Sequence, residues 1–532
     1  MLASRPYSGV SVLDLDSDVA GAYATMLLAE LGAETVRVES GRFGADPRFR
    51  LWSRRKTIAA LDPHSSSDRS ALVGLVGGAD VLVRTMPGEE AGRAGLSYPS
   101  LRPVNPRLVY CAMPPFGESG PLADAPADEG VISAHAGIYG DQGGWDGPPV
   151  YVNLPIASYG AAFLAAGAIG AALCEREASG LGQQVEASLY CGALAMQSGT
   201  MVTGPNVRSW VRESTDQMGV NPVYQFYECA DGEWLMFTCG TDTFWNKLCI
   251  ALERFEWTED PRFEGAPWNL EPANRPALRS LIADVISTEA GRHWIRVLSE
   301  HDVPCDLVRS RAQFFEHPQT IESGVFESGR DDVLGPVTWM APPVKLSPVP
   351  AGPPTARASS SNRSGGPLAG TRVVDLTGYI AGSYAASLLA DLGADVIKVE
   401  SPAGDGFRVI GGSFQAWNRG KRGIVVDLRR PEGREVVYDL VRQADLVAEN
   451  FRPGAAVRLG VDEPTLRALR PGLVYLSVSG YGGPGPLSGE PAFDPLIQAL
   501  TGAMSAQGTD GHPIFLKAVS YTHLTLPTKR IV

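Results

Sequence analysis

Short apolar runs alternate along the chain with stretches of helical periodicity. Residues 10–15 and 35–38 are compact apolar runs, and residues 20–31 between them repeat apolar positions at helical spacing. Gly32 follows the helical stretch, where a helix usually ends. A strand, a helix and a second strand in this order predict a βαβ unit with parallel strands.

The same pattern returns near residue 370. The segments GVSVLDLDSDVAGAYATMLLAELGAETVRVES (9–40) and GTRVVDLTGYIAGSYAASLLADLGADVIKVES (370–401) are identical at 17 of 32 positions. The likeness resumes between 106–122 and 471–487. A repeat of this length predicts a tandem duplication of a whole folding unit, not a short solenoid repeat.

Further apolar runs at 81–83 and 108–112 alternate with helical stretches, so the expected fold class is α/β with a parallel, doubly wound sheet. Glu39 and Glu400 end the second strand of each unit, where a dinucleotide-binding fold carries a ribose-binding acid. The first turns, however, read DLDSDVAG and DLTGYIAG and lack the GxGxxG fingerprint. NAD binding is therefore not favoured.

Residues 215–330 show a different pattern of predicted strands and helices. Two strands are predicted on either side of an Asp231-Gly232 turn, followed by helices near 243–252, 275–285 and 291–300. This pattern predicts a small α+β domain inserted into the first unit.

The chain therefore divides into four predicted parts. They are a complete first half at 1–350 (large domain 1–210 and 331–350, small domain 215–330), a Gly/Ser/Pro-rich linker at 351–367, a second half at 368–519 that holds only the beginning of its large domain, and a tail at 520–532. The tail, SYTHLTLPTKRIV, has no counterpart in the first half, and we expect it to be non-native.

Composition narrows the classes of function. With 46 basic and 59 acidic side chains, the net charge of −13 argues against nucleic-acid binding. The longest apolar stretch, 161–174, is too short to span a bilayer and predicts a buried helix, so no membrane association is expected. Seven cysteines without a CxxC pair predict a cytoplasmic protein, and scattered histidines predict no metal site.

Four motifs of the second half carry a family resemblance. They are LLADLGADVIKVE (388–400), NRGKRGIVVDL (418–428), ENFRPG (449–454) and SGYGGPGPL (479–487). In this order they resemble the class III CoA-transferases, the group of formyl-CoA and carnitine CoA-transferases and α-methylacyl-CoA racemases. The resemblance implies a Rossmann-like large domain, a small domain and two interlocked protomers. Here the two halves are expected to form an intramolecular pseudo-dimer, with a further homo-oligomer left open.

The resemblance also implies a reaction. An enzyme aspartate attacks an acyl-CoA, and CoA passes through anhydride and aspartyl-thioester intermediates to a small carboxylic acid, with no tightly bound cofactor. Ser158 stands at the position of that aspartate, in a stretch that offers it no nearby base, so a helix N-cap is the favoured role. The corresponding aspartate of the second half falls near position 522, inside the expected non-native tail. We therefore expect the full-length enzyme to be active, from its second half alone, and the chain as printed to be inactive.

The resemblance implies a set of CoA-binding residues as well. In the second half these are Lys398, Lys421, Asn450, Phe451, Arg452 and Arg458. In the first half Arg37, Lys56 and Arg93 stand at equivalent places, but ENFRPG is replaced by RTMPG (84–88). The first half thus lacks much of the predicted patch.

Two other functions stay open. A racemase of this family uses a histidine beside an acid, whereas 127–129 reads ADE and 492–494 reads AFD, and His135 lies further on in a predicted helix. A non-catalytic CoA-binding pseudoenzyme is the second alternative.

Overall fold

The structure, a computed structural model, describes residues 5–15, 17–41, 46–205, 207, 216–347, 365–517 and 529–531. The first half opens with a six-stranded sheet in which all strands run parallel. In spatial order its strands are β3 (Lys56–Ala59), β2 (Glu34–Val38), β1 (Ser11–Leu15), β4 (Val81–Arg84), β5 (Val109–Ala112) and β6 (Gln184–Glu186). The predicted parallel α/β fold is confirmed for this half.

Helices cover both faces of this sheet. One face packs against α1 (Val19–Glu30), α8 (Ile156–Ser179) and α9 (Leu189–Met196), and the other packs against α3 (Arg69–Gly77) and α5 (Tyr98–Leu101). The remaining helices of this unit are α2 (Pro47–Trp52), α4 (Gly88–Ala94), α6 (Glu129–His135) and α7 (Ile138–Asp141), with a 3₁₀ turn at Ser198–Thr200.

The buried helix expected at 161–174 is confirmed and is longer than predicted. By length and hydropathy α8 is the one helix of the described residues that could cross a bilayer. It packs along α1 and α9, and 56% of its apolar window is buried inside the protein. This placement fits a core helix.

The second half repeats the sheet order. Strands β16 (Arg422–Val425), β15 (Asp395–Glu400), β14 (Arg372–Asp375), β17 (Leu446–Glu449) and β18 (Val474–Val478) are parallel and follow the order of β3 to β5 in the first half. At the other edge, β19 (Lys529–Ile531) pairs antiparallel with β18 and parallel with β13 (Val344–Leu346). The helices are α15 (Ala381–Asp391), α16 (Gly412–Asn418), α17 (Pro431–Val441), α18 (Ala455–Leu459) and α19 (Glu463–Leu469), with a 3₁₀ turn at Gly406–Ile410.

The predicted small α+β domain is present. Its antiparallel sheet has the order β10 (Cys305–Leu307), β9 (Trp234–Thr238), β8 (Tyr224–Glu228) and β7 (Gly219–Asn221), and Gly232 takes a positive φ in the β8–β9 turn. Helices α10 (Asp242–Ala251), α11 (Arg275–Ile286) and α12 (Gly291–Glu300) enclose a core that includes Trp245, Trp257 and Trp294. Short 3₁₀ turns lie at Phe255–Thr258, Pro261–Phe263 and Pro272–Asn274.

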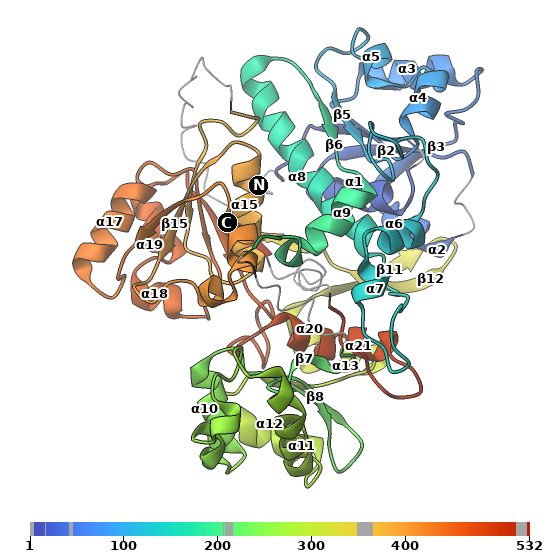
Figure 1. The fold of residues 1–532 in the computed structure, drawn as a ribbon. Coiled ribbons are helices and arrows are strands. Elements are labelled where there is room, and N and C mark those ends of the chain that lie inside the picture. The colour runs from blue at the N-terminus through green and yellow to red at the C-terminus, as the bar shows by residue number, and fades with distance from the viewer. Residues whose placement is uncertain are drawn as a thin grey trace.

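A return segment leads from the small domain back to the first half. It comprises α13 (Arg311–Glu316), α14 (Pro318–Ser323) and the hairpin of β11 (Phe326–Asp331) and β12 (Gly335–Met340). From the second sheet, α20 (Asp494–Leu500) and α21 (Ala503–Gln507) cross over to lie beside the small domain (Figure 1). There Leu496 and Met504 share an apolar core with Phe226 and Met236 of the small domain.

Hydrogen bonds join equivalent positions of the two halves reciprocally. Gln142 donates to the carbonyl oxygen of Phe515 (2.8 Å), and Gln507, 365 positions after Gln142, donates to that of Tyr151 (2.7 Å). The amides of Lys517 and Asn153 donate to the side-chain oxygens of the same two glutamines (3.2 and 3.0 Å). One hydrogen-bond arrangement is therefore made twice, with the roles of the halves exchanged.

Parts of two predicted segments, the linker and the tail, lie outside the described residues. Residues 351–364 of the linker and 520–528 of the tail, including the position near 522, lie outside the described residues. Of the tail, only the backbone of Lys529–Ile531 is described.

Candidate CoA site

A cleft opens at the carboxyl ends of the strands of the second sheet. Its volume is about 580 Å³, and its walls come from the loops that follow β14, β15, β16 and β17. The strand order reverses direction at β14, which has β15 on one side and β17 on the other. In open α/β sheets, ligands bind at such a switch point.

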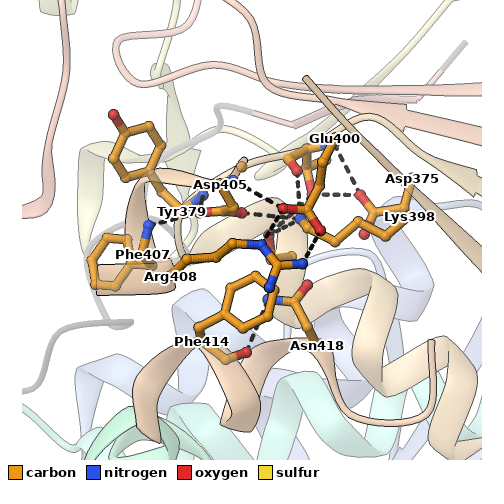
Figure 2. A network of polar contacts seen from close by, with 12 residues as sticks. Asp375, Tyr379, Lys398, Glu400, Asp405, Phe407, Arg408, Phe414 and Asn418 are labelled. Atoms are coloured by element: carbon orange, nitrogen blue, oxygen red, sulfur yellow. Dashed lines mark hydrogen bonds and ion pairs between the residues drawn. The ribbon is translucent and has the colours of Figure 1, made fainter. Parts of the chain in front are cut away.

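Buried ion pairs lie next to the cleft, and Figure 2 shows Lys398 beside Asp405, which lines it. Lys398 lies 3.0 Å from Asp405 and donates to the carbonyl oxygen of Thr377. Lys421 lies 2.8 Å from Asp375, and burial lowers the pKa of Lys421 despite that carboxylate. Both predicted lysines thus lie beneath the cleft and brace it, because their charges are already compensated.

A third ion pair includes Glu400, which lines the cleft. The Arg408 guanidinium forks onto Glu400 with two contacts of 2.6 Å and lies 4.2 Å from the centre of the Phe414 ring. Hydrogen bonding to Arg408 lowers the pKa of Glu400, whereas burial acts against it. Figure 2 shows the fork above Phe414, beside the backbone of the Tyr379 loop. Sequence reasoning missed Arg408, because its position eight residues after Glu400 signals nothing by itself.

Asn450 fixes the loop that follows β14. Its side-chain oxygen accepts from the amide of Gly378, and its side-chain nitrogen donates to the carbonyl oxygen of the same residue, both at 2.8 Å. The next residue, Tyr379, has a φ of 60°, an uncommon conformation for a non-glycine residue. Asn450 therefore holds a strained loop that lines the cleft.

Two further residues of the ENFRPG motif, Phe451 and Arg452, line the cleft. Arg452 contacts Asp302 of the small domain at 2.9 Å, and Asp302 also lies 2.6 Å from Lys247. Arg458 is exposed on α18 and does not line the cleft. Of the six predicted second-half residues, Asn450, Phe451 and Arg452 meet at the cleft surface.

The predicted residues of the first half have other partners. Asp14 is buried between Arg37 (2.9 Å) and Lys56 (3.0 Å). Asp14 and Lys56 stand at the positions of Asp375 and Lys421, so each half contains the same buried Asp–Lys pair. Arg93 is exposed and pairs with Glu89 one helical turn away. These three cations do not assemble a patch.

The RTMPG segment of the first half is also engaged internally. Arg84 is buried, ion-pairs with Glu118 and donates to the Tyr110 hydroxyl (2.6 Å). Thr85, at the position of Asn450, accepts from the amide of Asp18 (3.0 Å). The first-half loop is thus held by other residues and lacks the Asn-Phe-Arg surface.

Ser158 differs from the expectation in two respects. It is the third residue of α8, whose N-cap is Pro155, so the predicted N-cap role is wrong. The sequence also predicted no base near Ser158, whereas the Ser158 hydroxyl donates a hydrogen bond to the carboxylate of Glu129 (2.7 Å). Glu129 further accepts from the amides of Ala157 and Ser158, both at 2.8 Å, and thereby caps the helix that Ser158 was expected to cap. Glu129 was missed because 29 residues separate it from Ser158.

Two smaller hollows continue the cleft toward the small domain. The outer hollow, about 230 Å³, shares Tyr379, Asn450, Phe451 and Arg452 with the cleft. The inner hollow, about 40 Å³, shares Tyr379, Phe407 and Asp494 with the outer one. The path therefore runs from the strand ends of the second half into the small domain of the first. Among the described side chains, no group of three His, Cys, Asp or Glu is placed to hold a metal ion.

Comparison with known proteins agrees with this architecture. The family described as CoA-transferase family III matches residues 7–358 and 368–525. The chain belongs to this family. It is 29% identical to the probable CoA-transferase Rv1866 of Mycobacterium tuberculosis over 91% of this chain, and it spans 66% of that relative's length. It is also 29% identical to acetyl-CoA:oxalate CoA-transferase of Acetobacter aceti, covering 64% of this chain and 89% of the relative.

Solved structures show the same fold. Rv3272 of Mycobacterium tuberculosis aligns with a TM-score of 0.56 at 23% identity, covering 65% of this family member and 94% of that chain. A CAIB/BAIF family protein of Brucella suis aligns with a TM-score of 0.52 at 26% identity, covering 64% and 93%. The mixed α/β fold of this family member is thus shared with solved relatives.

Proposed function

We propose that this protein transfers CoA from an acyl-CoA donor to a carboxylic acid, and that the cleft of the second half holds the CoA. The observation that carries the proposal is the set Asn450, Phe451 and Arg452 at the switch-point cleft of 580 Å³. Loop amides, one aromatic ring and one guanidinium meet there, which suits a phosphorylated nucleotide with a flexible arm.

The proposed chemistry uses an enzyme carboxylate as nucleophile. The carboxylate attacks the thioester carbonyl and expels CoA thiolate, which leaves a mixed anhydride. Return of the thiolate gives an enzyme thioester and frees the donor acid. The acceptor carboxylate then attacks the enzyme thioester and expels CoA thiolate, which gives a second mixed anhydride. The thiolate attacks the acceptor's carbonyl carbon of that anhydride, so that acceptor-CoA forms and the enzyme carboxylate is released. We expect this carboxylate in the native second half, at the position equivalent to Ser158, where this chain carries the tail of residues 520–532, and not at Ser158.

The proposal includes a pseudo-dimer within one chain. The reciprocal hydrogen bonds of Gln142 and Gln507 support it, because a two-fold arrangement makes each contact twice. The small domain of residues 215–330 also supports it, since Asp302 reaches Arg452 of the other half. A cytoplasmic location belongs to the proposal as well, and the seven free cysteines support it.

Calorimetric titration of the 532-residue chain with free CoA tests the proposal. We expect Phe451→Ala to weaken CoA binding about tenfold, because the ring lines the cleft. Met86→Ala is the matched control, since Met86 stands at the position of Phe451 in the first half, and it should leave the affinity unchanged. No CoA binding by the parent chain, or equal effects of both variants, would contradict the proposed site.

A transfer assay with the same preparation completes the test. With no carboxylate at position 158 and none expected in the tail, we expect CoA binding without measurable CoA transfer. Turnover by this chain would show that the inferred nucleophile position is wrong. A chain extended with native sequence that binds CoA but transfers none would favour the CoA-binding pseudoenzyme.

A further inference from the structure

Another large hollow lies between the first half and the return segment. Its volume is about 420 Å³, within the range of small-molecule sites. Its lining comes from α1, α2 and α8 of the first half and from α13, β11 and β12 of the return segment. Thr501 and Ala503 of the second half also line it. The hollow shares no lining residue with the CoA cleft or with the two hollows that continue the cleft.

Six aromatic side chains dominate the lining. The rings of Tyr23 and Tyr159 lie 4.8 Å apart, centre to centre, and those of Phe314 and Phe326 lie 5.7 Å apart. The six are Tyr23, Trp52, Tyr159, Phe314, Phe326 and Trp339. Aromatic rings attract one another in offset-stacked and edge-to-face arrangements, so this lining favours a ligand that is itself aromatic.

Both charged side chains among the described lining residues are arginines. Arg54 is ion-paired with Glu30, which does not line the hollow. Arg311, the first residue of α13, is exposed, and no described side chain pairs with its guanidinium. Burial raises the pKa of Tyr159, and the charges of Arg48 and Arg311 act against this rise, so Arg311 lies within electrostatic reach of Tyr159. One arginine of the aromatic lining is therefore available to an anion.

A buried hydroxyl of the lining also lacks a partner among the described residues. Tyr23 is 5% exposed, and no described group forms a hydrogen bond with its hydroxyl. Leaving a buried hydroxyl unpaired costs free energy, because the group gives up its hydrogen bonds to water. A bound molecule with a polar atom within reach of Tyr23 would remove that cost.

The equivalent place in the second half is filled by the chain itself. Trp417 stands at the position of Trp52, and its indole nitrogen donates to the Ser198 hydroxyl of the first half (3.1 Å). Trp52 lines the hollow instead. An uncharged segment like the one at Ser198 would leave Arg311 without a partner, so the arginine favours a small anion as the occupant.

We infer that this hollow binds an aromatic carboxylic acid, at a site separate from the CoA cleft. The carboxylate pairs with Arg311, because a planar guanidinium matches the two oxygens of a carboxylate. The aromatic body of the acid lies among the rings of the lining, and the Tyr23 hydroxyl supplies a further hydrogen bond.

Calorimetric titration of the 532-residue chain with naphthalen-2-ylacetate and with its neutral amide, naphthalen-2-ylacetamide, tests the inference. We expect the acid to bind about tenfold more tightly than the amide, because only the carboxylate carries the charge that pairs with Arg311. Equal affinities, or no binding of either compound, would overturn the inference. Saturating free CoA should leave the affinity for the acid unchanged, and displacement of the acid by CoA would overturn the separate site.

Two variants locate the acid. Arg311→Gln should lower the affinity for the acid about tenfold and leave that for the amide unchanged. The control Arg292→Gln, on the exposed surface of α12, should leave both affinities unchanged. Tyr23→Phe keeps the ring and should weaken binding of the acid about threefold through the lost hydrogen bond. Unaltered binding of the acid in both lining variants would overturn the assignment of the hollow.

A synthetic peptide with the sequence of residues 196–202 tests the other occupant. This segment contains Ser198, which contacts Trp417. We expect the peptide to leave naphthalen-2-ylacetate bound. Displacement of the acid by the peptide would show that the hollow receives a chain segment, and it would overturn the inference.

Discussion

Buried lysine–aspartate pairs explain why basic residues of a CoA-transferase motif fail to form a basic surface. Lys56 and Lys421 occupy the same place in the two halves, and each lies within 3.0 Å of an aspartate in the last two residues of a central strand. An unpaired charge at such a depth would be strongly destabilising, so each lysine requires its carboxylate. The first half keeps this pair although it has lost ENFRPG. The pair therefore stabilises the fold of each half. In the second half it supports the cleft without contributing to the cleft surface.

The stabilising role of the buried pair in the first half can be measured through the pH dependence of unfolding, because Asp14 is titratable. Burial alone would raise its pKa, but Lys56 and Arg37 together hold it well below its usual range. A carboxyl group whose folded-state pKa is depressed stabilises the fold above its unfolded pKa, near 4, and loses that contribution as the pH falls further. Asp14→Asn should lower the unfolding free energy by about 3–5 kcal/mol at pH 7, because two buried cations lose their partner.

Urea unfolding between pH 7 and pH 2.5 checks this prediction. The difference between the parent chain and Asp14→Asn should shrink below about pH 4, as the parent loses its ionised carboxylate. The exposed Asp332→Asn serves as the control and should follow the parent throughout. A difference that stays constant with pH would refute the assigned role of Asp14.

The first turn of helix α8 is capped by a side chain from another helix. Glu129, at the start of α6, accepts the first free amides of α8 at Ala157 and Ser158 and also the Ser158 hydroxyl. Carboxylates suit a helix N-terminus because the unpaired amides there carry partial positive charge. The helix that carries Ser158, the position that we propose to be equivalent to the nucleophile, is thus anchored by a carboxylate that accepts three hydrogen bonds there.

Two substitutions separate the contributions at this helix start. Ser158→Ala removes one hydrogen bond and should cost about 1 kcal/mol of unfolding free energy, whereas Glu129→Ala leaves the amides unpaired and should cost about 2–3 kcal/mol. Ser66→Ala, at an exposed serine, should cost almost nothing. Chemical denaturation measures all three. A larger loss for Ser158→Ala than for Glu129→Ala would contradict the proposed capping role.

The two halves are joined across one continuous interface. Besides the glutamine contacts, α20 and α21 share a buried cluster with strands of the small domain, among them Leu496 against Phe226. Figure 1 shows these helices away from their own sheet and beside the small domain. The small domain of the first half therefore completes the path that begins in the cleft of the second.

The reciprocity of the glutamines predicts matched effects. Gln142→Ala and Gln507→Ala should each lower the unfolding free energy by about 1–3 kcal/mol, because each removes the partner of two buried or partly buried hydrogen bonds to the backbone of the other half. The exposed Gln415→Ala is the control. Unfolding followed by tryptophan fluorescence and by circular dichroism should remain one transition in all variants. A large effect for one glutamine and none for the other would contradict a two-fold arrangement.

Much of the architecture could be read from the chain. Apolar periodicity located β1, α1 and β2 to within about a residue, and the Asp231-Gly232 turn located the β8–β9 hairpin. The motif ENFRPG identified the residues that meet at the cleft surface. The motif lysines Lys398 and Lys421 were predicted to bind the ligand, and the structure places them in buried ion pairs outside the cleft lining. A sequence motif does not distinguish a lysine that faces a cleft from one that is buried beneath it.

Local patterns fix the elements because helix and strand formation depend on neighbouring residues and on the period of apolar positions. The sequence by itself thus determined the βαβ units, the small domain and the family. Only the tertiary structure decided which charges are already paired, as with Asp14 and Lys56, and which distant residues meet, as with Glu129 and Ser158 or Arg452 and Asp302. Such contacts bring together residues 29 to 150 positions apart. Their formation depends on how whole elements pack, and no local pattern records that packing.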